Sequence, residues 1–161
     1  RELASGVRND SLFLDIGFGM GKKDFYAHCW DMNKQGLVKQ GPNNLSVEYR
    51  MDSSTSLPVF MRFYPQFEEN KIIRMPVEFS YVTFTPTDPS TSAETLLEEV
   101  KQLMEQWYGE GFLYMEDEEG MRKLWIKVDG NRQIRIFKKD VATVAVDITD
   151  MSVPSNQAEE S

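Results

Sequence analysis

The residues of this chain that could carry out chemistry are His28, Cys29 and the numerous carboxylates. His28 is the single histidine and Cys29 the single cysteine among 161 residues. Adjacent side chains on a helix point about 100° apart, so these two cannot form a tight base–nucleophile pair. Asp24 and His28 share one helical face, but two ligands alone do not define a metal site. We therefore expect Cys29 in the hydrophobic core and His28 at its boundary.

A glycine-rich segment precedes the first expected helix and invites comparison with phosphate-binding loops. It reads Gly17-Phe18-Gly19-Met20-Gly21-Lys22-Lys23. A Walker loop has four residues between its first glycine and the Gly-Lys pair, and Ser or Thr follows that pair. Here three residues intervene and Lys23 follows. No βαβ pattern of a dinucleotide site follows either, so we predict a flexible entry to the helix.

Carboxylates cluster in residues 116–120, which read Glu-Asp-Glu-Glu-Gly. Such a run could attract a hard cation, but it lacks the alternating ligand spacing of a calcium loop and is typical of a solvated turn. The sequence has no Gly-x-Ser-x-Gly elbow, and no spacing singles out two carboxylates for glycoside chemistry. The prediction is a protein that is not an enzyme and uses no metal or cofactor. The alternative is a small enzyme or ligand carrier with a pocket between helix and sheet.

Composition limits the kinds of partner and location. The formal net charge is -8, which disfavours binding to nucleic-acid phosphates and anionic membranes. No apolar run reaches the roughly 18 residues that a membrane helix needs, so no transmembrane segment is predicted. A single cysteine excludes an internal disulfide. Because the sequence begins at Arg1, we expect a processed or partial form, with any signal peptide or lipid-bearing cysteine upstream.

Two amphipathic helices are predicted from apolar residues at intervals of three and four. The first covers residues 22–35, and the second covers residues 92–108 after a capping-box pattern from Thr91 to Glu94. Gly36 and Gly109 are expected to end them. The predicted buried residues are Phe25, Cys29 and Met32 in the first helix and Leu96, Val100, Leu103 and Trp107 in the second.

Period-two alternation after each helix predicts strands. We place them at residues 45–51, 59–64, 72–84, 112–116, 121–128, 133–137 and 141–148. Asp129-Gly130 is typical of a tight hairpin. Pro76 cannot donate to a sheet ladder, so its strand is expected at an edge or with a bulge. The predicted fold class is α+β, an antiparallel sheet with helices packed on one face.

The order of elements suggests two divergent α-β-β-β repeats. Residues 12–84 would form the first and residues 92–151 the second, with residues 85–91 as a proline-containing linker. The sharpest match pairs Asn-Lys-Ile-Ile-Arg-Met at 70–75 with Asn-Arg-Gln-Ile-Arg-Ile at 131–136. Residues 1–11 are expected to be a loose N-terminal segment. Residues 152–161 have little apolar content and are expected to be a disordered tail.

Charge asymmetry in the second half points to a binding surface. Acidic residues predominate from 94 to 119 and basic residues from 122 to 139. If Leu124, Ile126 and Val128 face the helices, alternation turns their neighbours to the opposite face, where aromatic and arginine side chains favour protein recognition. The expected occupant is a protein or peptide, or a second copy of this chain. The predicted partner-binding residues are Trp125, Lys123, Lys127, Arg135, Phe60, Arg62 and Tyr64.

The first half also resembles a known family. The residues Gly19-Met20-Gly21-Lys22-Lys23-Asp24-Phe25, a following helix, Gly41-Pro42 and the strands at 59–63 and 71–75 are similar to BamE (SmpA/OmlA)-like and β-lactamase-inhibitor-protein-like modules. The similarity covers residues 16–75, although Gly21 replaces the usual hydroxyl cap, the helix to Gly-Pro spacing is longer, and the second half lacks the opening motif. PepSY-like domains are the neighbouring alternative.

What the resemblance implies is a sheet of tandem copies with helices on one face. It also implies a non-catalytic binding module in the periplasm or secreted, often as a lipoprotein. A cytoplasmic location stays open, because nothing in the residues themselves decides it.

Overall fold

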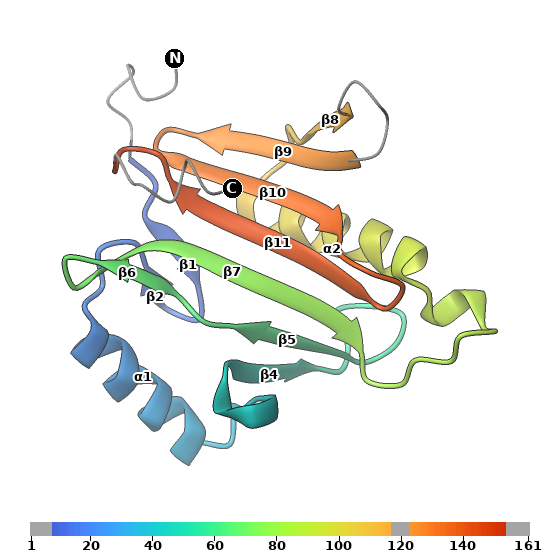
Figure 1. The fold of residues 1–161 in the computed structure, drawn as a ribbon, viewed down its shortest axis with the longest axis horizontal. Coiled ribbons are helices and arrows are strands. Elements are labelled where there is room, and N and C mark those ends of the chain that lie inside the picture. The colour runs from blue at the N-terminus through green and yellow to red at the C-terminus, as the bar shows by residue number, and fades with distance from the viewer. Residues whose placement is uncertain (1–7, 117–122, 154–161) are drawn as a thin grey trace.

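The computed structural model describes residues 8–116 and 123–153, which fold around one large antiparallel sheet (Figure 1). Within these residues the sheet has nine strands in the order β3-β4-β5-β7-β11-β10-β9-β8, with β6 beside β7. The neighbouring strands run antiparallel throughout. The predicted α+β class and antiparallel sheet are confirmed.

Each half of the chain supplies a helix followed by strands of this sheet. The first half contains α1 (Lys22–Lys34), β3 (Val38–Gln40), β4 (Val47–Met51), β5 (Val59–Phe63), β6 (Gln66–Glu68) and β7 (Lys71–Tyr81). The second contains α2 (Ala93–Tyr108), β8 (Leu113–Glu116), β9 (Lys123–Asp129), β10 (Arg132–Lys138) and β11 (Thr143–Asp150). The halves meet where their last strands, β7 and β11, pair. This order is compatible with an internal repeat, which stays a prediction.

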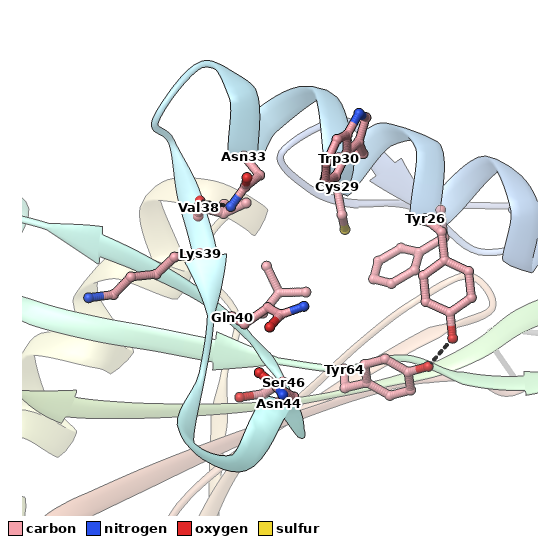
Figure 2. A pocket seen from close by; sticks show the side chains of 12 residues that line it. Tyr26, Cys29, Trp30, Asn33, Val38, Lys39, Gln40, Asn44, Ser46 and Tyr64 are labelled. Atoms are coloured by element: carbon pink, nitrogen blue, oxygen red, sulfur yellow. Dashed lines mark hydrogen bonds between the residues drawn. The ribbon is translucent and has the colours of Figure 1, made fainter.

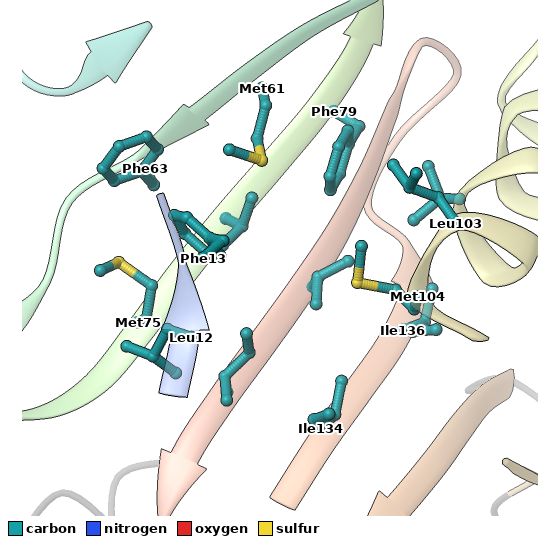
Figure 3. Packing of buried hydrophobic residues seen from close by; sticks show 14 of the residues in the cluster. Leu12, Phe13, Met61, Phe63, Met75, Phe79, Leu103, Met104, Ile134 and Ile136 are labelled. Atoms are coloured by element: carbon teal, nitrogen blue, oxygen red, sulfur yellow. The ribbon is translucent and has the colours of Figure 1, made fainter. Parts of the chain in front are cut away.

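One hydrophobic core lies between the sheet and the two helices. Alternate strand residues such as Met61, Phe79 and Ile136 are buried beneath Leu103 and Met104 of α2 (Figure 3). A short hairpin of β1 (Ser11–Phe13) and β2 (Ile16–Gly17) fills the same side of the sheet. The ring of Phe13 lies 4.9 Å from that of Phe63, edge to face, a favourable aromatic geometry.

Helix α2 begins one residue later than predicted and ends at the predicted residue, and its cap and one core residue also differ from the prediction. Ser92, not Thr91, is the N-cap, and its hydroxyl accepts a hydrogen bond from the Thr95 amide at 3.2 Å. Trp107 is 36% exposed, because it lies in the last turn of the helix. Its ring centre lies 6.1 Å from that of Phe13, and the two rings are tilted relative to each other. Met104 is buried in its place. The other predicted core positions of α2 are buried.

The glycine-rich segment is a helix entry held by β7 rather than a phosphate loop. The Gly19 amide donates to the Ile72 carbonyl, and the Ile72 amide donates to the Met20 carbonyl, both at 2.9 Å. The Asn70 side chain accepts from the Lys22 amide at 3.2 Å. An anion would need free amides at this helix start. Asn70 already occupies the first of them, and Gly19 has a positive φ that suits glycine.

Pro76 lies in β7, which is not an edge strand, so of the two expected positions the edge is wrong. An irregularity does lie nearby, since the register of β6 with β7 shifts between Gln66 and Phe67. β5 ends at Phe63 opposite Val77, and β6 pairs with β7 only from Arg74 backwards. Pro76 therefore sits between the ends of β5 and β6, where the ladder on that side is interrupted. A proline, which has no amide hydrogen, is tolerated in a strand where a ladder is interrupted in this way.

Leu45 was predicted to begin a strand, but it precedes β4 and is exposed. It follows the 3-10 turn η2 (Pro42–Asn44). A second turn, η3 (Pro89–Thr91), precedes α2. Residues 1–7 and 154–161, and positions 117–120 of the acidic run, lie outside the described residues. No helix in the described part of the chain is long and apolar enough to cross a membrane.

The start of the described chain is bonded to the ends of β10 and β11. The Asn9 amide donates to Asn131 Oδ1 at 2.6 Å. Asn131 Nδ2 donates to Asp150 Oδ1 at 3.1 Å, and Arg8 Nη1 donates to Ser152 Oγ at 2.9 Å. Asp150 is thus the acceptor at the centre of a network that joins both ends of the fold.

Replacing Asp150 with Asn is expected to lower the free energy of unfolding by about 1 kcal/mol at pH 7. Burial acts to raise the pKa of Asp150, but hydrogen bonds from Ser152 and Asn131 and the charge of Arg8 outweigh it, so the pKa is lowered. A lowered pKa stabilises the fold above the ordinary value of about 3.9, and this is lost as pH falls through the folded-state value. Urea unfolding between pH 7 and pH 2 measures the difference between the two proteins. A difference that does not shrink in acid would contradict this account.

Candidate binding face of the sheet

The sheet face opposite the helices, here called the open face, carries a row of alternating charges. Lys39, Glu48, Arg62 and Glu78 lie side by side across β3, β4, β5 and β7. Glu48 is buried and binds both neighbours, Arg62 Nε at 2.8 Å and Lys39 Nζ at 3.3 Å. Opposite charges directly across strands stabilise a sheet. The row therefore fixes the positions of its outer, more exposed members.

A second charged cluster lies at the junction of the two halves. Asp147 of β11 is 5% exposed and accepts from Arg74 Nε at 2.7 Å and Arg74 Nη2 at 2.6 Å. Arg135 Nη2 of β10 donates to the same carboxylate at 2.8 Å. Two guanidinium groups thus share one carboxylate, which leaves an excess of positive charge. The buried Nε of Arg135 makes no hydrogen bond within the described part of the chain.

The open face becomes apolar toward its other end. The register continues the charged row through Ala145 and Phe137 into β9 and β8. Leu124 and Ile126 of β9 are partly exposed there, and Leu113 and Met115 of the edge strand β8 are exposed. These apolar residues are Leu113, Met115, Leu124, Ile126, Val128 and Phe137. The face thus has a charged part and an apolar part, which is the mixture found in protein interfaces.

A groove of about 400 Å³ hollows the charged part of this face. It lies between the η2 turn and strands β5 and β7. Its lining includes Leu45, Arg62, Pro76 and Glu78. An exposed leucine beside paired charges offers both an apolar contact and hydrogen-bonding groups.

The structure divides the predicted partner-binding residues among three places. Phe60, Arg62 and Arg135 lie on the open face, with the Arg62 guanidinium 4.8 Å from the centre of the Phe60 ring. Tyr64 follows β5 and its ring contacts Phe25 of α1. The other three lie on the helix face and are treated next.

The prediction that Lys123, Trp125 and Lys127 point away from the helices is wrong. Trp125 pairs with buried Ile136, and Lys101 Nζ of α2 lies 4.3 Å from the centre of its ring. Lys127 shares this face and binds Asp129. The strand has apolar residues at both parities, so alternation alone does not choose the face. The largest ring of the strand packs on the side of the helix, against the hydrophobic core.

Replacing Trp125 with Ala is expected to lower the free energy of unfolding by about 1 to 3 kcal/mol. The change removes the contact with Lys101 and the ring contact with Tyr114, whose centre lies 5.1 Å away. Chemical denaturation measures this loss. Replacing Tyr114, which is exposed at the edge, is the matched control and is expected to cost less. Equal stability of the Trp125 variant and the parent protein would contradict the helix-face position.

A cleft of about 570 Å³ separates α1 from strands β3 and β4 (Figure 2). The hydroxyls of Tyr26 and Tyr64 hydrogen-bond to each other across one end. The Cys29 thiol points from the helix into this space, and Cys29 is half-buried rather than in the core as predicted. His28 is bonded to the Leu14 carbonyl through Nε2 at 2.6 Å. Asp24 does not join it in a metal site: the described residues contain no cluster of three potential metal ligands.

Cys29 is expected to react slowly with iodoacetamide at pH 8, roughly tenfold or more below an unfolded control. Burial raises the pKa of the Cys29 thiol to about 11, so little thiolate is present until the pH approaches that value. Mass spectrometry of alkylation against pH measures this in the native protein and in urea. A native rate equal to the unfolded rate at pH 8 would contradict the protected position.

Two site residues were not found from the sequence. Asp147 binds two arginines, and Glu48 binds Arg62 and Lys39. The sequence does contain a signal for Asp147. This carboxylate stands in the apolar run Val144-Ala145-Val146-Asp147-Ile148, and a buried charge needs a partner. Which arginines supply that partner follows from strand order, which local periodicity does not contain.

The chain was compared with family models, curated proteins and solved structures. No family model matches the chain, and neither a curated protein nor a solved structure shows significant similarity to it.

Proposed function

We propose that this protein is a non-catalytic binding module that recognises a protein partner with its open sheet face. The observation that carries the proposal is the cluster of Arg74, Asp147 and Arg135, in which two arginines share one buried carboxylate. Packing between strands holds these guanidinium groups in place before any partner arrives. Preorganised arginines lose less conformational freedom on binding than mobile surface chains.

The charge of the open face supports a partner that is acidic where it touches. The basic strand residues whose side chains lie on the open face are Lys39, Arg50, Arg62, Arg74 and Arg135, and the acidic ones are Glu48, Glu78 and Asp147. Basic groups thus outnumber acidic ones, although the whole chain carries a net charge of -8. A local field opposite in sign to the rest of the molecule directs an acidic partner to this face.

The apolar end supplies the second part of the proposed interface. Leu113 is 67% exposed and Met115 lies beside it on the edge strand β8. Together with Leu124, Ile126 and Phe137 they form a continuous apolar strip across three neighbouring strands. Contiguous exposed apolar surface next to charged groups is typical of a protein-binding site.

Capture of partners from an extract of the native organism tests the proposal when three matched variants are compared. Lys139 follows β10 and binds Glu78 of the open face. Arg50→Glu with Lys139→Glu changes the charge of this face, and Leu113→Ser with Met115→Ser changes its apolar end. Lys23→Glu with Lys34→Glu makes the same charge change on α1. We expect the first two variants to lose a partner that the parent and the α1 variant retain. Equal capture by all four proteins would contradict the proposal.

A second copy of the chain is the competing occupant of this face. Sedimentation velocity of the parent and the Leu113→Ser/Met115→Ser variant separates the two cases. If the parent protein is a dimer and the variant is a monomer, the occupant of the sheet face is a second copy of this chain and not an acidic partner.

The proposed location is the cell envelope or the exterior of the cell. This part of the proposal rests on the resemblance of residues 16–75 to envelope modules. Fractionation of cells that express the complete gene, with an antibody against this chain, tests it. Recovery in the cytoplasm would contradict it.

A further inference from the structure

We propose that the cleft between α1 and strands β3–β4 binds a neutral carbohydrate. The cleft opens on the helix side of the sheet, because its strand residues Val38 and Val47 pair with Tyr49 and Phe63. It adjoins the groove of the open face, with which it shares Ser46 and Tyr64. The cleft measures about 570 Å³. This lies within the range of roughly 300 to 1,000 Å³ that small-molecule sites occupy.

Exposed aromatic side chains gather at this cleft. Trp30 is 63% exposed at its rim, and Tyr26 and Tyr64 are also exposed. The Tyr26 and Tyr64 rings are held by their shared hydrogen bond and by Phe25, whose ring centre lies 5.7 Å from Tyr26 and 6.1 Å from Tyr64. Fixed aromatic rings with polar tips can pack on the apolar C–H faces of a sugar ring and still bond its hydroxyls.

Apart from Lys39, the polar residues that line the cleft are neutral and both donate and accept hydrogen bonds. Asn33, Gln40, Asn44 and Ser46 contribute carboxamides and a hydroxyl. Carboxamides and hydroxyls match sugar hydroxyls, each of which also donates and accepts. A purely aromatic ligand would leave most of these groups without partners once water is displaced.

Lys39 is the one charged residue among those that line the cleft, and its ammonium group does not enter it. Lys39 is directed away from it (Figure 2) and binds Glu48 on the open face. Burial raises the pKa of Cys29 to about 11, and the hydrogen bond with Tyr26 raises that of Tyr64 to about 12, so both are neutral at pH 7. No carboxylate is among the residues that line it. An ionic ligand would lose its hydration here without gaining a counter-charge.

Isothermal titration with maltotriose, cellotriose, xylotriose and chitotriose tests the proposal. Digalacturonic acid serves as the charged probe and p-cresol as the aromatic one. We expect at least one neutral trisaccharide to bind and neither other probe to compete with it. Trp30→Ala and Gln40→Ala should each weaken binding about tenfold or more, which corresponds to about 1.4 kcal/mol. Tyr114→Ala, an exposed ring at the opposite edge of the sheet, should leave the affinity unchanged.

Protection of Cys29 from alkylation by the bound sugar gives a second readout inside the cleft. Thermal unfolding of each variant shows that it is folded before it is scored. The proposal is overturned if no neutral trisaccharide binds at millimolar concentration, if Trp30→Ala binds as the parent does, or if p-cresol is the probe that occupies the cleft. These variants leave the open face intact, so their outcome is independent of partner capture by that face.

Discussion

Replacing Asp147 with Ala is expected to lower the free energy of unfolding by about 3 to 5 kcal/mol. The carboxylate is buried and accepts three hydrogen bonds from Arg74 and Arg135. Without it, two partly buried guanidinium groups lie close together with no counter-charge. Removing one partner of a buried ion pair costs far more than the net contribution of the pair, because the remaining charge stays desolvated. Guanidinium denaturation at pH 7 measures the loss.

An exposed carboxylate on the same sheet provides the matched control. Asp52 accepts from Arg50 Nε at 2.7 Å, but both side chains are more than half exposed. Solvent screens such a pair, so Asp52→Ala is expected to cost less than about 1 kcal/mol. A loss below about 1 kcal/mol for Asp147→Ala as well would mean that the arginine cluster does not depend on its carboxylate, and it would weaken the proposed binding face.

Replacing Leu103 with Ala is expected to lower the free energy of unfolding by about 2 to 5 kcal/mol. Leu103 is 3% exposed on the inner side of α2 and packs over the sheet (Figure 3). The loss combines the transfer energy of the deleted carbons with the cavity they leave, so its size depends on how far Met104 and its neighbours close the space. Urea unfolding measures it.

Leu113→Ala is the control of equal chemistry, since Leu113 is exposed on β8. It is expected to change stability by less than about 0.5 kcal/mol. Comparable losses at the two leucines would contradict the position of α2 over the sheet. A loss below about 0.5 kcal/mol at Leu103 alone would contradict the buried face of α2.

Local patterns predicted the elements well because each pattern reflects one period. Leu96, Val100 and Leu103 follow the helical interval over about two turns, and the alternation of Val59, Met61 and Phe63 places them on one side of a strand, as the structure confirms. Phe60 and Arg62 followed from the same alternation. The charged row that includes Arg62 could not be predicted from this alternation, because its other members come from β3, β4 and β7.

Strand β9 shows where such reasoning stops. Leu124, Ile126 and Val128 alternate with Trp125 and two lysines. Each face of the strand therefore carries apolar side chains, and either face could be the one that packs against the helix. The choice depends on α2, which presents Lys101 to the Trp125 ring. That contact joins elements far apart in sequence. The Asn70 cap of α1 was invisible for the same reason, since a helix start in the first half is completed by a hairpin residue nearly fifty positions later.

The bond between Arg8 and Ser152 makes the described backbone almost a closed ring. The two halves are then connected twice, covalently through the loop from β7 to η3 and non-covalently where the ends meet. A chain whose ends were joined there and whose backbone was opened between Thr85 and Asp88 would cross no strand or helix. Such a circularly permuted chain is therefore expected to keep the pairing of β7 with β11, which joins the two halves.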